Sequence, residues 1–100
     1  MQVTKDYNEN EVVLSVEGRI DSGSVGLLQS EILNAFSDSN MLVLDFGDVE
    51  YISSAGLRAL LIGQKTAMSK KGYMKVLHVN EEVRNVFTIT GFMDVLQIVD

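Results

Sequence analysis

The clearest local pattern near the start of the chain is an alternation of apolar and polar residues. Val12, Leu14 and Val16 fall on one side of an extended segment, while Val13, Ser15 and Glu17 fall on the other. A period of two is typical of a strand with one buried face. The pattern therefore predicts a strand over 12–17, with a turn at the following glycine.

A helical period replaces this alternation over residues 21–36. Asp21, Ser22 and Ser24 precede the apolar stripe, and each has an oxygen that can accept hydrogen bonds from free N–H groups in a first helical turn. The stripe itself recurs at intervals of three and four residues: Val25, Leu28, Ile32, Ala35 and Phe36. These residues predict a first helix.

A short apolar run and a second helix follow. Residues 41–45 read MLVLD, which predicts a central strand ending at Asp45, followed by a short acidic loop with Asp48 and Glu50. The helix begins after Ser53-Ser54 and ends at Gly72, a residue suited to a left-handed terminating conformation. Its predicted buried stripe is Leu57, Leu60, Leu61 and Met68.

The last third of the chain repeats this alternation of strand and helix. Residues 74–79 predict a strand, Asn80 is placed to cap a helix that ends at Gly91, and residues 96–99 predict a final strand. Helix-long connections between strands favour parallel neighbours. We therefore predict an α/β fold with a mixed, mainly parallel sheet of four to five strands and three to four helices.

Composition narrows the functional classes. A chain of 100 residues with 46% apolar residues fits one domain over 1–100, and its formal charge of −6 does not favour nucleic acid as a partner. Ten of the fourteen acidic residues lie in residues 1–57. There is no cysteine and no apolar run long enough to span a membrane, so we expect a cytoplasmic protein without direct membrane insertion.

The side chains that usually carry catalysis are scarce. His78 is the single histidine and lies inside the predicted strand 74–79, where a packed or edge histidine is the simpler interpretation than a general base. Neither a metal-ligand cluster nor a glycine-rich nucleotide loop occurs. We therefore expect no enzyme activity, no metal and no cofactor.

The informative stretch is residues 44–61, LDFGDVEYISSAGLRALL. Here a strand leads to a serine pair at the start of a helix whose first turn holds the small residues Ala55 and Gly56. On its own, this arrangement is also that of an ordinary serine N-cap on a helix that packs closely on a sheet.

The same stretch resembles the signature of STAS domains, particularly bacterial anti-sigma-factor antagonists. The matching residues are 49–58, VEYISSAGLR, after the predicted strand-final Asp45, and a second match is Gly18-Arg19-Ile20-Asp21-Ser22. The resemblance extends over nearly the whole chain, about residues 3–99. It implies a single STAS domain.

The resemblance also implies a function. Members are phosphorylated by an anti-sigma factor that is also a serine kinase, on the serine two positions before the glycine of Gly-Leu. That position is Ser54 here. Ser53 is the second choice, because this chain has a serine where many phosphorylated members have aspartate, and this leaves two adjacent hydroxyls. The resemblance implies release of a sigma factor by the unphosphorylated form and inactivation by the phosphate, which a serine phosphatase would remove.

The partner-binding residues expected for such a protein lie around the serine pair. The resemblance implies a binding role for Asp21. A second polar stripe on the predicted helix contains Arg58 and, as an exposed apolar residue, Ile62. The complete predicted surface is Asp21, Ser22, Ser53, Ser54, Arg58 and Ile62. The sequence also leaves a homodimer open.

Two alternatives remain. The chain could be a STAS subunit that docks, without phosphate control, on the ATPase of a membrane lipid transporter of the ABC type. It could also be a response-regulator receiver phosphorylated on Asp45, although residues 12–20 lack the acidic pair that such a domain places after its first strand.

Overall fold

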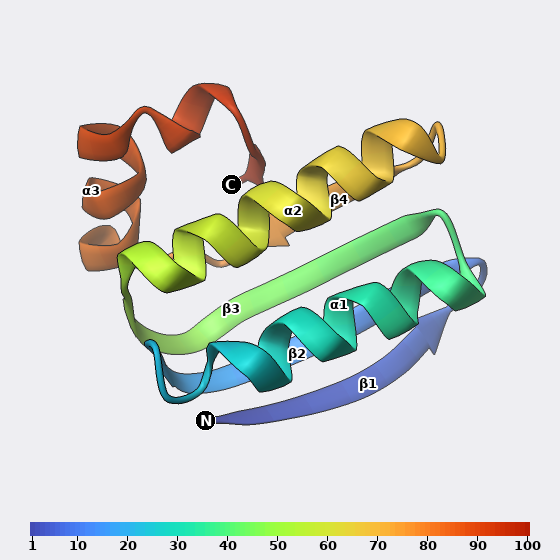
Figure 1. Cartoon of the computed structure of the whole chain (residues 1–100), viewed down its shortest axis with the longest axis horizontal. Coiled ribbons are helices and arrows are strands. Elements are labelled where there is room, and N and C mark those ends of the chain that lie inside the picture. The colour runs from blue at the N-terminus through green and yellow to red at the C-terminus, as the bar shows by residue number, and fades with distance from the viewer.

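The computed structural model describes residues 1–100 as one five-stranded sheet with helices packed against it (Figure 1). The strands lie in chain order, with β1 antiparallel to β2 and every other pair parallel. The strands are β1 (Gln2–Asn8), β2 (Glu11–Ile20), β3 (Met41–Ile52), β4 (Tyr73–Leu77) and β5 (Gln97–Val99). The helices are α1 (Val25–Asp38), α2 (Ser54–Ser69), α3 (Glu81–Thr90) and a short 3₁₀ turn, η1 (Phe92–Asp94).

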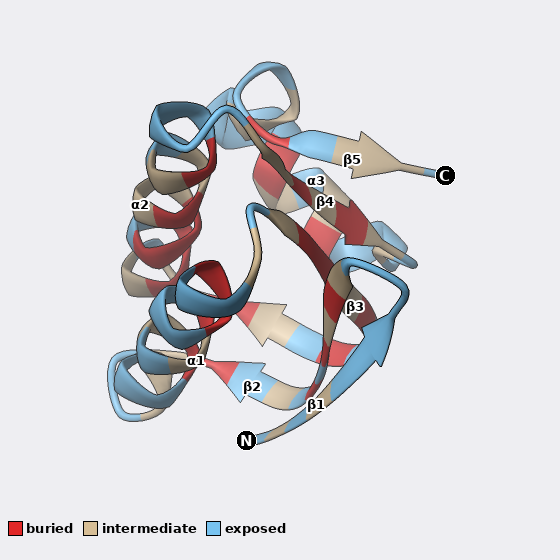
Figure 2. Cartoon of the chain, turned by 90° about the vertical axis from the view of Figure 1, so that its right-hand side faces the viewer, coloured by how far each residue is buried: buried red, intermediate tan, exposed pale blue.

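Helices α1 and α2 lie side by side on one face of the sheet (Figure 2). Helix α1 connects β2 to β3 and helix α2 connects β3 to β4, and both pairs are parallel neighbours in the sheet. Crossovers of the same hand that advance in one direction along a sheet place their helices on the same face. Helix α3 lies at the end of the molecule where β3 leads into α2 (Figure 1). The mixed, mainly parallel α/β sheet predicted from the sequence is confirmed.

One hydrophobic cluster joins the sheet to the helices. The alternating residues of β2, Val12, Leu14 and Val16, are at most 1% exposed and pack into this cluster. Other fully buried side chains come from every layer: Leu28, Ile32 and Phe36 from α1, Leu42, Leu44 and Phe46 from β3, Leu60 from α2, and Phe87 from α3. The core therefore fixes where the helices begin relative to the strand ends.

The structure adds a strand that the sequence analysis missed. Strand β1 pairs with β2 along its whole length, from Gln2 opposite Glu17 to Asn8 opposite Glu11. Its residues are half-buried or exposed, with Val3 as the one aliphatic side chain among them. An edge strand with so little buried surface produces only a weak hydrophobic alternation, and this explains the missed element.

Strand β3 does not end at Asp45 but continues to Ile52, so the predicted acidic loop is wrong. Asp48 and Glu50 are exposed residues of the strand. The pairing of β2 with β3 shifts register twice, and β3 has one extra residue at each shift. Such bulges change which face the following residue occupies, so the buried residues beyond Asp45 do not alternate.

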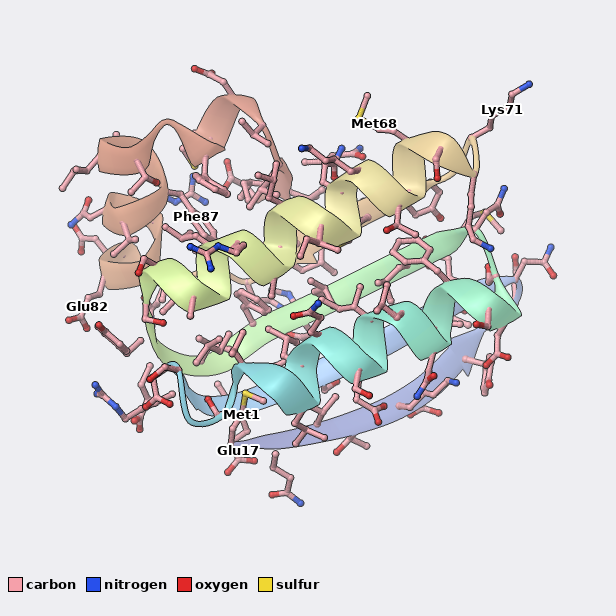
Figure 3. All side chains as sticks on the ribbon, in the orientation of Figure 1. Met1, Glu17, Met68, Lys71, Glu82 and Phe87 are labelled. Atoms are coloured by element: carbon pink, nitrogen blue, oxygen red, sulfur yellow. The ribbon has the colours of Figure 1, made fainter.

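Three other local predictions are also wrong. Met68 is 67% exposed and projects from α2 into solvent (Figure 3). Beyond α2, Lys71 rather than Gly72 adopts the left-handed conformation, with φ +59°. Gly72 is required for a different reason, because a Cβ there would lie 1.6 Å from the carbonyl oxygen of Asn40. His78 lies just beyond β4, exposed and with φ +59°, instead of inside a strand.

A tyrosine at the amino end of β4 gives the fold a pH dependence. Burial and the hydrogen bond that its phenol donates to Glu11 raise the pKa of Tyr73 to about 12, from a usual value of 10.0. A raised pKa stabilises the fold below pH 10, and this contribution is lost as the pH rises through about 12.

We therefore expect the stability difference between the wild type and Tyr73→Phe to shrink as the pH rises from 9 towards 12. Urea unfolding at a series of pH values measures this difference. A difference that does not change with pH would show that the hydroxyl group has no such role.

None of the helices is long and apolar enough to cross a membrane.

Candidate functional site

The two segments singled out in the sequence meet at the carboxyl ends of β2 and β3. Ile20 and Ile52, the last residues of these strands, are paired neighbours. Beyond them, the Ser53 N–H donates a 2.8 Å hydrogen bond to the Ile20 carbonyl. This bond joins the loop that begins at Asp21 to the start of α2, so the structure brings the two predicted parts of the site together.

The two adjacent serines have different roles. Ser53 is the N-cap of α2: its hydroxyl oxygen accepts a hydrogen bond from the Gly56 N–H at 3.3 Å, and the residue is half-buried. Ser54 is the first residue of the helix, is exposed and takes no part in the cap. Of the two serines at the predicted helix start, Ser53 and not Ser54 is therefore the cap. Its hydroxyl is free for a reaction that leaves the cap intact.

Gly56 allows the start of α2 to lie directly on the strand ends. A Cβ at this position would be 2.6 Å from Cγ1 of Ile52 and 2.7 Å from Cγ2 of Ile20. Contacts this short require the two isoleucine side chains, the helix or the strands to shift. The small residue after the serine pair thus sets the distance between α2 and the sheet, and with it the position of Ser54.

The carboxylate of Asp21 organises the loop between β2 and α1. Its Oδ1 accepts hydrogen bonds from the Gly23 N–H at 3.0 Å and the Ser24 N–H at 3.2 Å. The Ser24 hydroxyl in turn donates to the Arg19 carbonyl at 2.8 Å. This turn occupies the residues directly before α1, which begins four residues after Asp21. Ser22 is exposed at the tip of the turn.

The polar stripe of α2 is only partly as predicted. Arg58 is exposed and forms no ion pair. Its side chain is therefore available to a partner, as predicted. Ile62 is half-buried rather than exposed among polar residues. A partner at this face would therefore contact Arg58, one turn beyond the serines. At Ile62 it would contact less apolar surface than a fully exposed isoleucine would offer.

Further charged residues lie at this edge, outside the set predicted to bind a partner. The Arg19 guanidinium lies over the ring of Tyr51, 4.3 Å from its centroid. Next to this pair, Glu17 of β2 lies opposite Asp48 of β3. Two like charges at directly paired positions repel each other. The two bulges bring these residues together, and nothing in the sequence spacing indicates them.

Asp45 lies away from the serine pair and forms a separate contact. Its Oδ1 accepts from the Gly47 N–H at 2.9 Å and lies 3.0 Å from Nδ1 of His78. Partial burial raises the pKa of the Asp45 carboxyl, but the hydrogen bonds from His78 and Gly47 outweigh it and hold this pKa below its usual value. The carboxylate is thus occupied by structural contacts. No cluster of three or more potential metal ligands occurs.

A pocket of about 410 Å³ lies at the opposite end of the sheet, where β1 turns into β2. Its lining is mostly polar and comprises Asn8, Glu9, Asn10, Glu11, Met41 and Tyr73. None of the predicted site residues contributes to it. The candidate site is therefore an exposed surface suited to a macromolecule, and not a cavity for a small molecule.

Comparison with known proteins identifies relatives that match over almost the whole chain. BtrV of Bordetella bronchiseptica, named as an anti-sigma factor antagonist, is 29% identical over 99 residues, which is 98% of this chain and 85% of BtrV. The anti-sigma-B factor antagonist of Bacillus subtilis is 28% identical over 98 residues, covering 98% of this chain and 90% of the relative.

Solved structures share the fold at lower identity. A structure from Thermotoga maritima, described as an anti-sigma factor antagonist, has a TM-score of 0.90 at 21% identity and covers 98% of this chain and 86% of its own. SpoIIAA of Bacillus in its phosphorylated form has a TM-score of 0.75 at 17% identity over 99% of this chain and 92% of SpoIIAA.

The order of strands also separates this fold from that of a receiver, whose parallel sheet has the order 2-1-3-4-5 rather than the consecutive order found here. The family model for the STAS domain matches residues 2–100. The chain belongs to the STAS domain family.

Proposed function

We propose that this protein is an anti-sigma factor antagonist controlled by phosphorylation of Ser54. In the unmodified state it binds an anti-sigma factor that is also a serine kinase, and this binding releases a sigma factor. The kinase transfers the γ-phosphoryl group of ATP to Ser54 Oγ, with loss of the hydroxyl proton and release of ADP. The phosphorylated protein no longer binds, and a serine phosphatase restores it. The protein itself acts by binding and catalyses no reaction.

The difference between the two serines is the observation that carries this proposal. Ser54 is exposed at the first position of α2, while the neighbouring Ser53 satisfies the free Gly56 N–H. A kinase can therefore modify Ser54 without removing the cap. Names of relatives and the known phosphorylated form of SpoIIAA support the same role.

The chemistry of a helix start fits such a switch. A phosphoserine carries about −1.5 to −2 charges at neutral pH, and an anion is favoured beside the free N–H groups at a helix N-terminus. The fold should therefore tolerate the phosphate. A partner docked on Asp21, Ser22, Ser53, Ser54, Arg58 and Ile62 would instead meet the new charge directly.

Phosphate mapping in the two serine variants tests the proposal. We expect the cognate kinase with Mg·ATP to add one phosphate to the wild type and to Ser53→Ala, and none to Ser54→Ala. Ser53→Ala should lose about 0.5–2 kcal/mol of stability through its cap, while Ser54→Ala should change stability little. Phosphate on Ser53, or a protein that is modified at neither serine and binds a transporter ATPase, would contradict the proposal.

A role of Asp21 in partner binding can be separated from its structural role in the loop. Asp21→Asn keeps an oxygen that can accept hydrogen bonds from Gly23 and Ser24, and removes the charge. We expect this variant to melt close to the wild type but to bind the anti-sigma factor more weakly, by about 1.5–3 kcal/mol if the carboxylate accepts a hydrogen bond from the partner. Calorimetric titration measures the loss, and an unchanged affinity would leave Asp21 with the structural role alone.

A further inference from the structure

Arg58 is the basic residue nearest to Ser54 along α2, and the structure gives it no partner. Other cations near strands and termini are engaged: Arg19 lies over Tyr51, Lys5 pairs with Asp38, and Arg84 pairs with Asp100. Arg58 is exposed and forms neither a side-chain hydrogen bond nor an ion pair. An unpaired guanidinium is thus available one turn beyond the serine.

The spacing places this guanidinium on the same helix face as Ser54. Residues four apart in an α-helix are surface neighbours, displaced by about 6 Å along the axis. Long side chains in a helix also lean towards its N-terminus, over the residue four positions earlier. An anion that precedes a cation by four residues has the more favourable order of charges. Both the spacing and the direction favour a contact from Arg58 to a group on Ser54.

We infer that Arg58 is the intramolecular partner of the phosphate on Ser54. This inference rests on the proposed function, since it concerns the modified form of the same site. A guanidinium can donate two parallel hydrogen bonds to phosphate oxygens, which makes such pairs stronger than those of neutral groups. The pair would form beside the intact Ser53 cap and would require no change in the backbone of α2.

The pair gives the switch a second effect. Before modification, Arg58 is free to contact a partner at the surface that contains Ser54. After modification, the same side chain is held against the phosphate. The phosphate then adds negative charge to the surface and also removes a donor from it. A partner that binds through Arg58 would therefore meet an additional negative charge and would also lose its contact with the Arg58 guanidinium.

Other charged residues do not offer the same contact. Lys65 lies on the exposed face of α2 but is eleven residues from Ser54, about 16 Å along the axis and beyond the Debye length of about 8 Å at 0.15 M salt. Arg19 is engaged with Tyr51. The acidic residues of the neighbouring loop and strand, Asp21 and Glu50, are the same in every variant used below.

The second ionisation of the phosphate measures the pair directly. Phosphoserine is installed at position 54 of the full chain during synthesis, so that no kinase is needed, and the phosphate is titrated by ³¹P NMR. In Arg58→Gln we expect the second pKa of this phosphate, about 6 in a free phosphoserine, to rise by about 0.3–0.6 relative to the wild-type sequence. The matched control Lys65→Gln removes the same charge from the same helix face and should change this pKa by less than about 0.1.

Two results would overturn the inference. One is an equal pKa in Arg58→Gln and the wild-type sequence, and the other is an equal rise in Arg58→Gln and Lys65→Gln, which would reveal a general field instead of a contact. Circular dichroism of each variant checks that α2 is intact. Because the phosphate is introduced chemically, the result is independent of whether a kinase modifies Ser54. Failure of the pair and failure of the proposed function are therefore distinguishable.

Discussion

We expect phosphorylation of Ser54 to lower the affinity for the anti-sigma factor by between about tenfold and ten-thousandfold. A charge of about −2 placed roughly 6 Å from one carboxylate of the partner is repelled by about 1.4 kcal/mol at a dielectric constant of 80 and about 5.5 kcal/mol at 20. Ser54 is exposed, so its phosphate would lie on the proposed binding surface and not within the core. The change should therefore appear in binding and not in folding.

Salt concentration separates charge repulsion from steric exclusion. The gap in affinity between the two forms should narrow as ionic strength rises from about 0.01 to 0.15 M, where the Debye length falls from about 30 to 8 Å. Calorimetric titration of both forms at several salt concentrations measures this gap, and thermal melting provides the control for the fold. A gap independent of salt would indicate a steric clash, while a lower melting temperature after phosphorylation would show that the switch disturbs the fold.

The parts of the fold that the sequence predicts are those whose cause is local. The alternation of β2, the helical period of α1 and the Asn80 cap each show their cause within a few residues, and the structure confirms them. The Asn80 side chain accepts from the Val83 N–H at 2.8 Å, and Gly91 ends α3 with φ +80°. Parallel pairing followed from the helix-long connections between strands.

The parts that the sequence does not predict depend on contacts distant along the chain. Strand β3 continues beyond Asp45 with two bulges, and its buried residues there no longer recur at every second position. The need for Gly72 comes from the approach of Asn40, which is far away in sequence. The bulges arise from the pairing of β2 with β3, and the approach of Asn40 to Gly72 arises where β3 and β4 begin side by side, so patterns within a single segment do not contain either effect.

The candidate site shows the same division. The serine pair, Asp21 and Arg58 were identified from motifs within two short segments, and the structure joins these segments through the hydrogen bond from Ser53 to Ile20. Which serine forms the cap was not predictable, because either hydroxyl suits a helix start. The Arg19–Tyr51 contact was missed because the bulge between Gly18 and Arg19 sets which residues are paired.

A methyl group added at Gly56 should have a large effect on both stability and the site. In Gly56→Ala the new Cβ would meet Ile52 and Ile20 at 2.6 and 2.7 Å, and these branched side chains are part of the buried core. Forcing an extra methyl group into a packed core costs about 1–3 kcal/mol. We expect the urea midpoint of this variant to fall accordingly.

Gly26→Ala is the matched control, because it makes the same change in a helix where nothing lies within 4 Å of the new Cβ. Alanine is the better helix former, so this variant should gain up to about 1 kcal/mol. At a temperature where both variants are folded, we also expect slower phosphorylation of Ser54 in Gly56→Ala than in Gly26→Ala, because displacing the start of α2 from Ile20 and Ile52 would also displace Ser54. Equal stability of the two variants would show that the sheet accommodates the methyl group without displacing the helix, and equal rates of phosphorylation would show that the kinase does not depend on the position that Gly56 sets.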